Sequence, residues 1–577
     1  MGRAGAKLAR LSAAIDAERD HARATDESLI DALTVRAQAA GDDPESSYRE
    51  VVSASRRKRL GQYFTPPPVA ELMIRWIAAI EPRSVLDPAV GPGIFPRLLR
   101  RECPDAVVTA IDVDPVALGA ARLALGRSAK LRLVEADFMT WDDAVAFDAA
   151  VANPPYLRHH DMAYEFDVHE AIGRRNGVTL SRLTNLYALF VLEICRRLRD
   201  GGRAAIVVPA EWMNANFGAP LKEWLLARGW LHTIVYWSHA TLPFEDALTT
   251  ASVLLIEKDA RRASRPVRAI YVTGDAAPDA LDHCLQAGTG HARVPDTAAP
   301  AGIVVRSLDR ATLLAHDKWN DIVGHGIRPA LPGFVRLGEL ATTRRGIATG
   351  ANRFFHLRPS EAARIGLRES SMRACVGRAV DVRGCVFTRD DYAALRGADA
   401  RGILLDIEGK PDAREQAYLA QGERNGVASR YLCASRAPHW HRMEQRPAAP
   451  VWAGVFARSG LRFVRNIAGV ANLTAFHCIY PFDDDPDHVA ALTACLGSDV
   501  VQAQARRHVR VYGAGLYKVE PRDLLEIPVP DLRKVARSTL RTLAEALTAL
   551  DRAMRAGSAA DAHAHLDALV RAAAAEA

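Results

Sequence analysis

The chain has 577 residues, of which 49% are apolar and 25% are charged. This composition is typical of globular proteins and excludes a mainly disordered or fibrous chain, and the length suggests about three or four domains. The formal net charge of +7 is small for this length, so it permits a nucleic-acid partner without requiring one.

No apolar run reaches the length of a membrane span, and the N-terminus lacks the apolar core of a signal peptide. We therefore expect a cytoplasmic protein that does not contact a membrane. The eight cysteines form no CxxC pair, which argues against a zinc ribbon or a disulfide framework and favours buried thiols.

Residues 1–55 read as an N-terminal helical segment, and the basic run 56–59 follows it. Short apolar runs then alternate with helical stretches across residues 56–260. This alternation predicts an α/β domain with a doubly wound, mostly parallel, seven-stranded sheet. The expected strands are 84–86, 107–111, 131–134, 147–152, 204–208, 233–237 and 251–256.

The remaining chain divides into three segments that differ in composition and in the spacing of apolar residues. Residues 261–330 contain Ala, Pro and Gly clusters and read as a connector with little core of its own. Residues 331–531 mix short strands, turns, aromatic side chains and arginines, which indicates an α+β domain. Residues 532–577 have leucines at helical spacing and predict a helical tail with a frayed end.

The first three expected strands each end in an acidic residue. Asp87 ends the first and opens a loop with two glycines, Asp112 ends the second, and Asp137 with Phe138 follows the third. Asp114 has a simpler interpretation, as the N-cap of the next helix. Each acid taken singly is as consistent with a cap as with a ligand, but three at successive strand ends are difficult to explain as caps.

These strand ends predict a cofactor site without phosphate recognition. The sequence has no GxxxxGK[ST] run, and an acid in the loop would repel phosphate. Asp112 lies where doubly wound domains place a carboxylate on ribose hydroxyls, and Asp137 and Phe138 suit an adenine ring. S-adenosylmethionine fits, because it combines an adenosine with a sulfonium and an ammonium group.

The fourth expected strand runs into Asn153-Pro154-Pro155-Tyr156. The two prolines fix the loop and remove two backbone donors. The Asn153 side chain and the Pro154 carbonyl then offer acceptors, and Tyr156 offers a flat ring. A rigid turn would explain the same residues, but their place after the fourth strand favours a catalytic loop.

Here the chain resembles the adenine-N6 DNA methyltransferases of the gamma arrangement (TaqI-like), in which the cofactor motifs precede NPPY and a target-recognition domain is C-terminal. The resemblance implies S-adenosylmethionine as methyl donor, direct transfer without a metal, and a target adenine rotated out of double-stranded DNA. The residues that match the family's cofactor motifs are Thr65, Asp87, Ala89, Gly91, Gly93, Asp112, Asp137 and Phe138.

The later part of the chain extends this resemblance. Phe244 matches an aromatic residue that packs on the target base opposite Tyr156. The runs 345–352 and 512–521 match the specificity domain of the family. Between Arg436 and Arg465 there are six arginines and one acid, Glu444, interspersed with aromatic residues, as contacts with phosphates and base edges require.

The resemblance implies a site-specific modification enzyme of a restriction-modification or related defence system, acting as a monomer on duplex DNA. The sequence leaves open whether a partner restriction endonuclease exists.

Three other functions agree less well with the sequence. A methyltransferase for protein glutamine or RNA is usually more compact. A bifunctional nuclease would need more than Glu408-Gly409-Lys410, which reads as a turn, and a non-catalytic DNA-binding protein would not need an intact NPPY loop.

Overall fold

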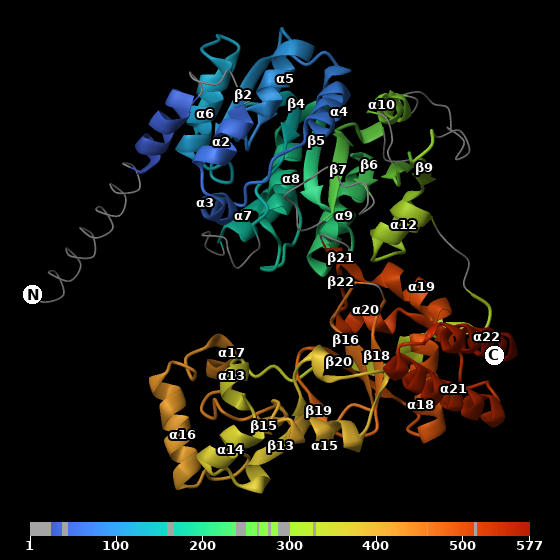
Figure 1. Ribbon diagram of the computed structural model, residues 1–577. Helices are drawn as coiled ribbons and strands as arrows, with labels where there is room; N and C mark the ends of the chain where they lie inside the picture. Colours follow the sequence, from blue (N-terminus) through green and yellow to red (C-terminus); the bar gives the residue numbers. More distant parts are fainter. Residues whose placement is uncertain are drawn as a thin grey trace, which may run out of the picture. The chain divides into compact units, whose positions relative to one another are not determined.

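The contacts of a computed structural model divide the chain into two compact units, Met1–Ile327 and Arg328–Ala577, each described by itself (Figure 1). The structure describes residues 25–36, 44–157, 167–237, 250–261, 265–274, 278–286, 300–326, 331–458, 460–512 and 516–577.

The first unit is built on a nine-stranded sheet with the order β3-β2-β1-β4-β5-β7-β6-β8-β9. Strands β1 to β5 are parallel, and β7 runs antiparallel to both of its neighbours. The strands are β1 (Ser84–Asp87), β2 (Val107–Asp112), β3 (Leu131–Glu135), β4 (Phe147–Ala152), β5 (Leu198–Pro209), β6 (Leu231–Trp237), β7 (Ala251–Glu257), β8 (Val267–Val272) and β9 (Ile303–Leu308).

All seven expected strands are present, and the α/β fold class is confirmed. The interpretation of residues 261–330 as a connector with little core is wrong. Strand β8 pairs in parallel with β6, and β9 closes this edge of the sheet. Ile270 and Val305 are buried in the same core as the central strands, so the segment is part of the domain. The weak βα alternation of this segment hid the two strands.

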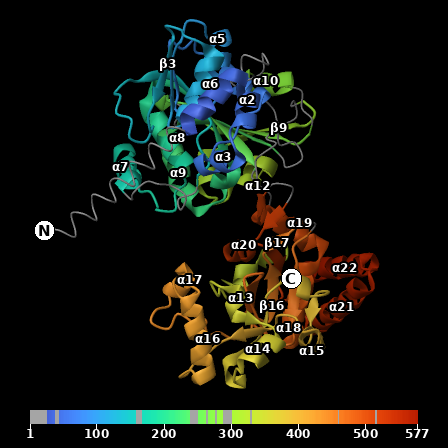
Figure 2. The ribbon, with the colours of Figure 1, turned by 60° about the vertical axis from the view of Figure 1, so that its left-hand side comes forward.

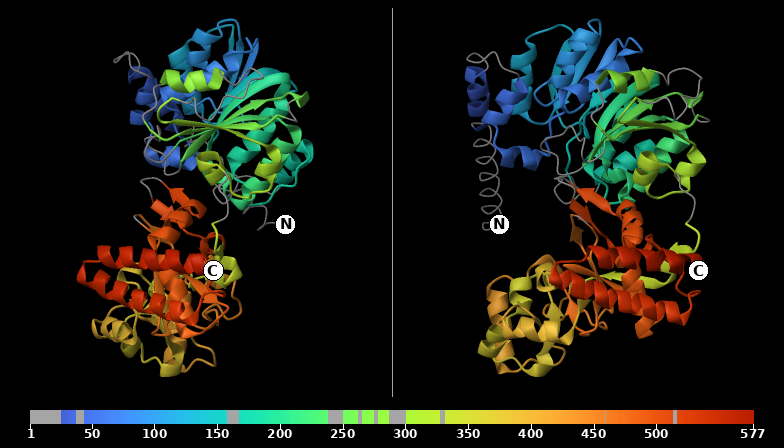
Figure 3. Two further views of the ribbon diagram at one scale, coloured as in Figure 1. Left: turned by 90° about the vertical axis from the view of Figure 1, so that its right-hand side faces the viewer. Right: turned by 45° about the vertical axis from the view of Figure 1, so that its right-hand side comes forward.

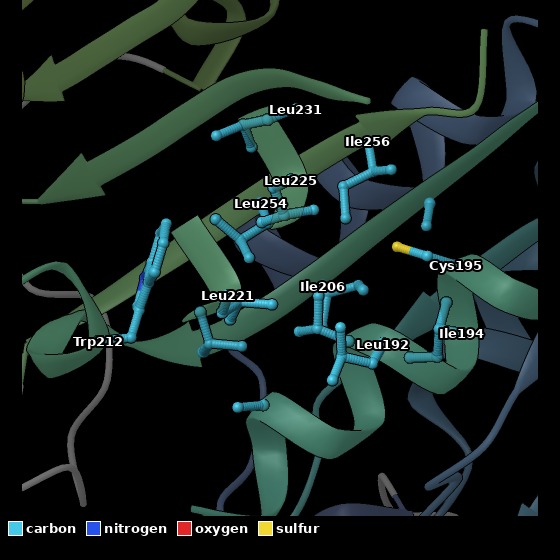
Figure 4. Packing of buried hydrophobic residues seen from close by; sticks show 14 of the residues in the cluster. Leu192, Ile194, Cys195, Ile206, Trp212, Leu221, Leu225, Leu231, Leu254 and Ile256 are labelled. Carbon is cyan, nitrogen blue, oxygen red and sulfur yellow. The ribbon is translucent and has the colours of Figure 1, made fainter. Parts of the chain in front are cut away.

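Helices cover both faces of the sheet. On one face α4 (Pro67–Ala78) and α5 (Ile94–Glu102) pack against the strands, and on the other lie α8 (Leu186–Arg197) and α9 (Ala219–Arg228). Figure 4 shows the second face, where Leu192 of α8 lies near Ile206 of β5. The further helices are α6 (Pro115–Leu125), α7 (Asp167–Asn176), α10 (Pro278–Gln286), α11 (Arg310–Leu314) and α12 (Trp319–His325).

The N-terminal helices pack onto the edge of this unit. Residues 25–36 are helical, and they are followed by α2 (Pro44–Val51) and α3 (Ala54–Leu60). Leu33 and Tyr48 share a small apolar core with Val116 of α6, and α2 lies beside α6 (Figure 2). The predicted helical segment is therefore joined to the cofactor half of the sheet.

The second unit is an α+β structure with four small sheets. The largest has the order β11-β20-β16-β18-β14, and a second has the order β12-β15-β13-β19. The strands are β10 (Phe334–Arg336), β11 (Ala341–Arg345), β12 (His356–Leu357), β13 (Met372–Val376), β14 (Val386–Phe387), β15 (Ile403–Leu405), β16 (Val451–Gly454), β17 (Phe456–Ala457), β18 (Phe463–Asn466), β19 (Ala471–Asn472), β20 (Phe476–Pro481), β21 (Arg510–Tyr512), β22 (Leu516–Lys518) and β23 (Pro528–Pro530).

The helices of this unit include the predicted tail. They are α13 (Asn352–Phe355), α14 (Pro359–Ile365), α15 (Arg389–Gly397), α16 (Ala413–Arg424), α17 (Tyr431–Ala434), α18 (Pro486–Gly497), α19 (Asp499–His508), α20 (Pro521–Leu525), α21 (Arg537–Ala556) and α22 (Ala560–Glu576). The last two lie side by side (Figure 3). The end of the chain is not frayed, because Val570 is buried and Glu576 accepts hydrogen bonds from Ala536 and Thr539.

All eight cysteines are buried and free, as expected. Among the described residues, no helix combines the length and the apolar content that a membrane crossing needs.

Candidate active site

The strand order brings the predicted site residues to one edge of the sheet. Strand β1 lies between β2 and β4 and is parallel to both. The carboxyl ends of these strands therefore meet, and each ends at or next to a residue that the sequence singled out: Asp87, Asp112 and Asn153. Ligands of doubly wound sheets bind at this kind of position.

Asp87 is completely buried at the end of β1. Its Oδ1 accepts a hydrogen bond from the backbone N–H of Ala89 at 3.3 Å, whereas its Oδ2 has no partner among the described residues. Burial raises the pKa of Asp87 well above its usual range, and the nearby Asp112 adds to this effect. A buried acceptor without a donor is costly, by about 1–3 kcal/mol, which is typical of a group that a ligand satisfies.

Asp112 holds the glycine loop to the end of β2. Its carboxylate accepts hydrogen bonds from the backbone N–H groups of Gly91, at 2.8 Å, and Asp114, at 2.9 Å. Burial raises the pKa of Asp112 to about 6. Gly93 has a φ of +99°, where a side chain would be strained and a Cβ would lie 3.2 Å from the Leu125 side chain. The loop therefore depends on both its glycine and the Asp112 carboxylate.

Asp114 caps α6, as expected, by accepting from the N–H of Val116. The same carboxylate has three further partners that the sequence did not indicate. Tyr48 lies 2.7 Å from its Oδ2, Gln62 donates to it at 3.0 Å, and Arg56 forms an ion pair with it at 2.7 Å. The N-terminal helices are therefore attached to the sheet at Asp114, two residues after Asp112.

Asp137 accepts the backbone N–H of Met139 at 2.9 Å at the end of β3. Phe138 differs from the expectation, because its ring is only 2% exposed. It packs against Phe190 with 5.2 Å between ring centroids, and the Arg197 guanidinium lies 4.8 Å from its ring centroid. The structure therefore does not show the open ring face that the sequence analysis expected for Phe138.

The Asn153 amide is held in one orientation by the segment before α4. Its Nδ2 donates to the Tyr63 carbonyl at 2.8 Å and to the Thr65 hydroxyl at 3.0 Å. Since a carbonyl can only accept, the nitrogen must face Tyr63, and the amide oxygen must point the other way. Oδ1 of Asn153 is buried and has no partner among the described residues. The loop thus presents a fixed, unsatisfied acceptor.

Tyr156 is enclosed on one side by a residue that the sequence analysis missed. The Tyr63 ring stacks on it with 5.0 Å between centroids, and Tyr187 meets it edge to face at 6.4 Å. Burial raises the pKa of the Tyr156 hydroxyl, which has no partner among the described residues. The expected stacking platform is therefore half covered, and Tyr63 is part of the site. Its only sequence signal was an aromatic residue two positions before Thr65.

The segment 61–65 and the catalytic loop are in direct contact. The N–H of Tyr156 donates to the Gly61 carbonyl at 2.9 Å. A Cβ on Gly61 would lie 2.8 Å from the Leu157 side chain and 2.9 Å from the Tyr156 nitrogen, so only glycine fits there. Thr65 is buried and uses its hydroxyl to hold Asn153.

Two further features lie apart from these contacts. Asn185, at the start of α8, donates to Glu211 at 2.9 Å. Phe244, predicted to pack on the target base, lies outside the described residues.

Four of the six arginines between Arg436 and Arg465 have structural roles in the second unit. Arg436 donates to the Thr349 carbonyl at 2.7 Å, and Arg465 to the Pro450 carbonyl at 3.1 Å. Arg462 donates to the carbonyls of Ala379 and Gly384, at 2.8 and 3.2 Å, and Arg446 is 7% exposed beside Glu444. The two arginines that are exposed are Arg442 and Arg458.

The aromatic residues of the same segment are divided in the same way. Trp440, Trp452 and Phe463 are buried, whereas Phe456 is 59% exposed on β17. The run 408–410 lies between β15 and α16 with a bend at Gly409, in agreement with its interpretation as a turn.

Family models match most of the chain in three pieces. Residues 49–99 match "N-6 DNA Methylase", residues 120–243 match "Eco57I restriction-modification methylase", and residues 329–570 match "Type II methyltransferase M.Eco57I, C-terminal domain". The first match contains Asp87, the second contains Asp137 and the Asn153 loop, and Asp112 lies between them, whereas the third covers most of the second unit.

Curated relatives are similar over nearly the whole length. The chain is 29% identical to the Type II methyltransferase M.AccI of Acinetobacter calcoaceticus, over 86% of this chain and 90% of that protein. It is 26% identical to M.XamI of Xanthomonas campestris pv. amaranthicola, over 83% and 87%. Among solved structures, the Type IIL restriction-modification enzyme MmeI in complex with DNA aligns with 92% of this chain and 79% of its own, at a TM-score of 0.56 and 12% identity, a likeness of fold.

The sheet order and the site define a class I methyltransferase fold that uses S-adenosylmethionine. More narrowly, the family matches and the relatives show a DNA adenine methyltransferase of a restriction-modification system. This excludes the alternatives of a protein or RNA methyltransferase and of a non-catalytic DNA-binding protein.

Proposed function

We propose that the chain methylates N6 of one adenine within a specific sequence of double-stranded DNA, with the motif order of the gamma arrangement. The observation that carries this proposal is the Asn153 amide, whose nitrogen is held by Tyr63 and Thr65 and whose buried oxygen has no partner among the described residues. The order of the matches supports the gamma arrangement, because the domain matched at residues 329–570 follows the catalytic loop.

S-adenosylmethionine supplies the methyl group when bound. The residues present fit this group, since Asp87 has a buried, unsatisfied oxygen that can accept from a cationic or hydroxyl donor. We assign the cofactor site to Thr65, Asp87, Ala89, Gly91, Gly93, Asp112 and Asp137. Asp112 accepts from the ribose hydroxyls in this assignment, while it also holds the loop through Gly91.

The chain activates the adenine amine through two acceptors. The amine lone pair is delocalised into the ring, which makes the nitrogen a poor nucleophile. Asn153 Oδ1 accepts one N–H and the Pro154 carbonyl accepts the other, so the nitrogen becomes tetrahedral and its lone pair is freed. Pro155 keeps the loop rigid. The fixed amide contributes mainly by positioning, and its dipole adds electrostatic stabilisation.

The target adenine leaves the duplex to reach these acceptors. A paired base cannot bring its amine to a buried side chain, so rotation out of the stack is needed. The ring of Tyr156 supports the base on the face that Tyr63 leaves free. Phe244 is assigned to the other side of the base by resemblance.

Methyl transfer to defined oligonucleotides tests the function. Sequencing of the modified bases in DNA from cells that express the protein identifies the methylated sequence. A duplex with this sequence should then gain N6-methyladenine at one position in vitro. A duplex with the target adenine replaced by 2-aminopurine should brighten on binding, because leaving the stack relieves quenching. Stacking on protein rings can mask part of this signal, so the Tyr156→Ala variant and permanganate reactivity of the opposing thymine are measured alongside. Absence of both signals would contradict base rotation.

A further inference from the structure

A surface of the second unit around α17 has no function in the site described above. Tyr431, the first residue of this short helix, is 85% exposed, and the next residue, Leu432, is 37% exposed. An exposed aromatic residue beside arginines is frequent in binding surfaces. Helices α13, α14, α16 and α17 form one group of the second unit (Figure 1).

The loop after β11 fixes α17 in place. The Thr349 carbonyl accepts from Arg436 at 2.7 Å and from the Cys433 thiol at 3.5 Å. Gly350 has a φ of +80°, and a Cβ there would lie 3.0 Å from the Cys433 sulfur. Thr349 and Gly350, within the run 345–352, therefore position α17.

A groove of about 390 Å³ lies beside α17, and three arginines line it. Arg353, Arg364 and Arg430 are exposed, and within the described residues no side-chain hydrogen bond or ion pair engages them. The acid in the lining, Glu361, is paired with Arg401 at 2.9 Å. The groove therefore carries three guanidinium groups without internal partners.

We propose that this arginine groove and Tyr431 contact the DNA substrate. The guanidinium groups bind the phosphodiester backbone, and Tyr431 makes an aromatic contact with the bases or sugars beside it. Charge selects the occupant, since three unpaired arginines match a polyanion. The proposal rests on the proposed function, because it names where the second unit meets the duplex.

Binding of the full-length chain to the duplex that it methylates tests this surface. Arg364→Ala and Arg430→Ala should each weaken binding about 3- to 10-fold and lower the slope of log affinity against log salt by about 1. Tyr431→Ala should weaken binding at least about 5-fold. Fluorescence anisotropy at several salt concentrations measures all three effects.

Two matched variants control for exposed side chains elsewhere in the unit. Phe482 is 64% exposed but precedes Asp483 and Asp484, and Arg552 is exposed on α21. Phe482→Ala and Arg552→Ala should change affinity less than about 2-fold. If the groove variants bind as tightly as these controls while the wild type methylates the duplex, the groove is not a DNA contact and the proposed function stands. A wild type that neither binds nor methylates duplex DNA would overturn both.

A second, independent observation concerns the connection between Asp112 and Asn153. Asp114, whose N–H donates to Asp112, is tied by its carboxylate to Gln62 at 3.0 Å. Tyr48 is completely buried and its hydroxyl lies 2.9 Å from Gln62 Oε1. The residue after Gln62 holds the Asn153 amide through its carbonyl. A continuous set of contacts thus joins the cofactor edge to the catalytic amide.

We infer that Gln62 is a positioning residue, which keeps the Tyr63 carbonyl where it orients Asn153. Gln62→Met removes the amide donor to Asp114 and the amide oxygen beside the Tyr48 hydroxyl at similar volume. It should lower kcat about 10-fold, with the KM for S-adenosylmethionine changed less than about 3-fold, because a small misplacement of a reacting group is costly.

The control is Ser53→Ala, which removes the N-cap of α3 on the same segment without touching Asp114 or residues 61–65. Thermal unfolding gives the stability of each variant, and activity is expressed per folded protein. A merely structural role predicts that kcat per folded protein stays unchanged in Gln62→Met. That result, or an equal fall in kcat for Ser53→Ala, would overturn the assignment.

Discussion

The two units of this enzyme use their polar side chains in opposite ways. At the sheet edge of the first unit, Asn153 and Asp87 each keep a buried oxygen that has no partner in the part of the chain that the structure describes. In the second unit, four of the six arginines in the segment 436–465 are engaged by backbone carbonyls or buried beside an acid. A residue of the catalytic motif is thus distinguished by a hydrogen-bond acceptor that the described part of the protein does not satisfy. A run of arginines, in contrast, indicates DNA contact only where the side chains have no hydrogen-bond or ion-pair partner within the protein.

The largest effect is expected at the unsatisfied acceptor of the first unit. Asn153→Ala should lower kcat by at least about 10³-fold, since it removes the oriented acceptor for the amine. The affinity for S-adenosylmethionine, measured by calorimetry, should stay within about 3-fold of wild type. Near wild-type turnover of the folded variant would mean that the Pro154 carbonyl alone activates the amine.

Separating the two units tests whether the second unit provides sequence-specific DNA recognition. A chain that ends at Ile327 should bind S-adenosylmethionine but lose specific DNA binding by about 10³-fold or more, the usual ratio of specific to non-specific affinity. The fragment must be folded by circular dichroism before footprinting is interpreted. A specific footprint from the fragment alone would place sequence recognition in the first unit.

Asp112→Ala should weaken S-adenosylmethionine binding by about 1.5–3 kcal/mol, the scale of hydrogen bonds to a charged group. Because its pKa is raised to about 6, the wild-type affinity should also fall as the pH is lowered through 6, when the carboxylate gains a proton. The raised pKa means that the folded chain binds this proton more readily than the unfolded chain, so protonation of this group does not itself destabilise the fold. Calorimetry between pH 5 and 8 measures both effects. An equal pH dependence in Asp112→Ala would assign the titration to another group.

A smaller loss is expected from the residue that orients Asn153. Thr65→Val removes one of the two acceptors for the amide nitrogen and should lower kcat about 10-fold, whereas Thr65→Ser keeps the hydroxyl and should remain within about 2-fold. Steady-state kinetics of both variants measure the difference. Equal activity of the two variants would show that the Tyr63 carbonyl suffices.

The last effect is expected in stability alone, within the second unit, with no change in catalysis. Arg462→Ala removes the guanidinium donor from the Gly384 carbonyl and should lower the free energy of unfolding by about 1–3 kcal/mol. The exposed Arg458→Ala should change it by less than about 0.5 kcal/mol. Urea unfolding distinguishes them, and equal stabilities would contradict the structural role of Arg462.

The sequence by itself determined the first seven strands, the order of the motifs and the meeting of Asp87, Asp112 and Asn153 at one sheet edge. These features follow from local periodicity and from the rule that parallel strands end together. Asn153–Tyr156 could be assigned to the site because the loop follows the fourth of these strands.

Only the tertiary structure decided which groups remain available. Residues distant in sequence satisfy or cover them: Tyr63 holds the Asn153 nitrogen and covers Tyr156, Phe190 encloses Phe138, and Gln62 reaches Asp114. Strands β8 and β9 were missed because they are stabilised by pairing with each other and with β6 rather than by a pattern of their own. Hydrogen-bond partners, burial and sheet edges are properties of contacts between segments, which local sequence patterns do not contain.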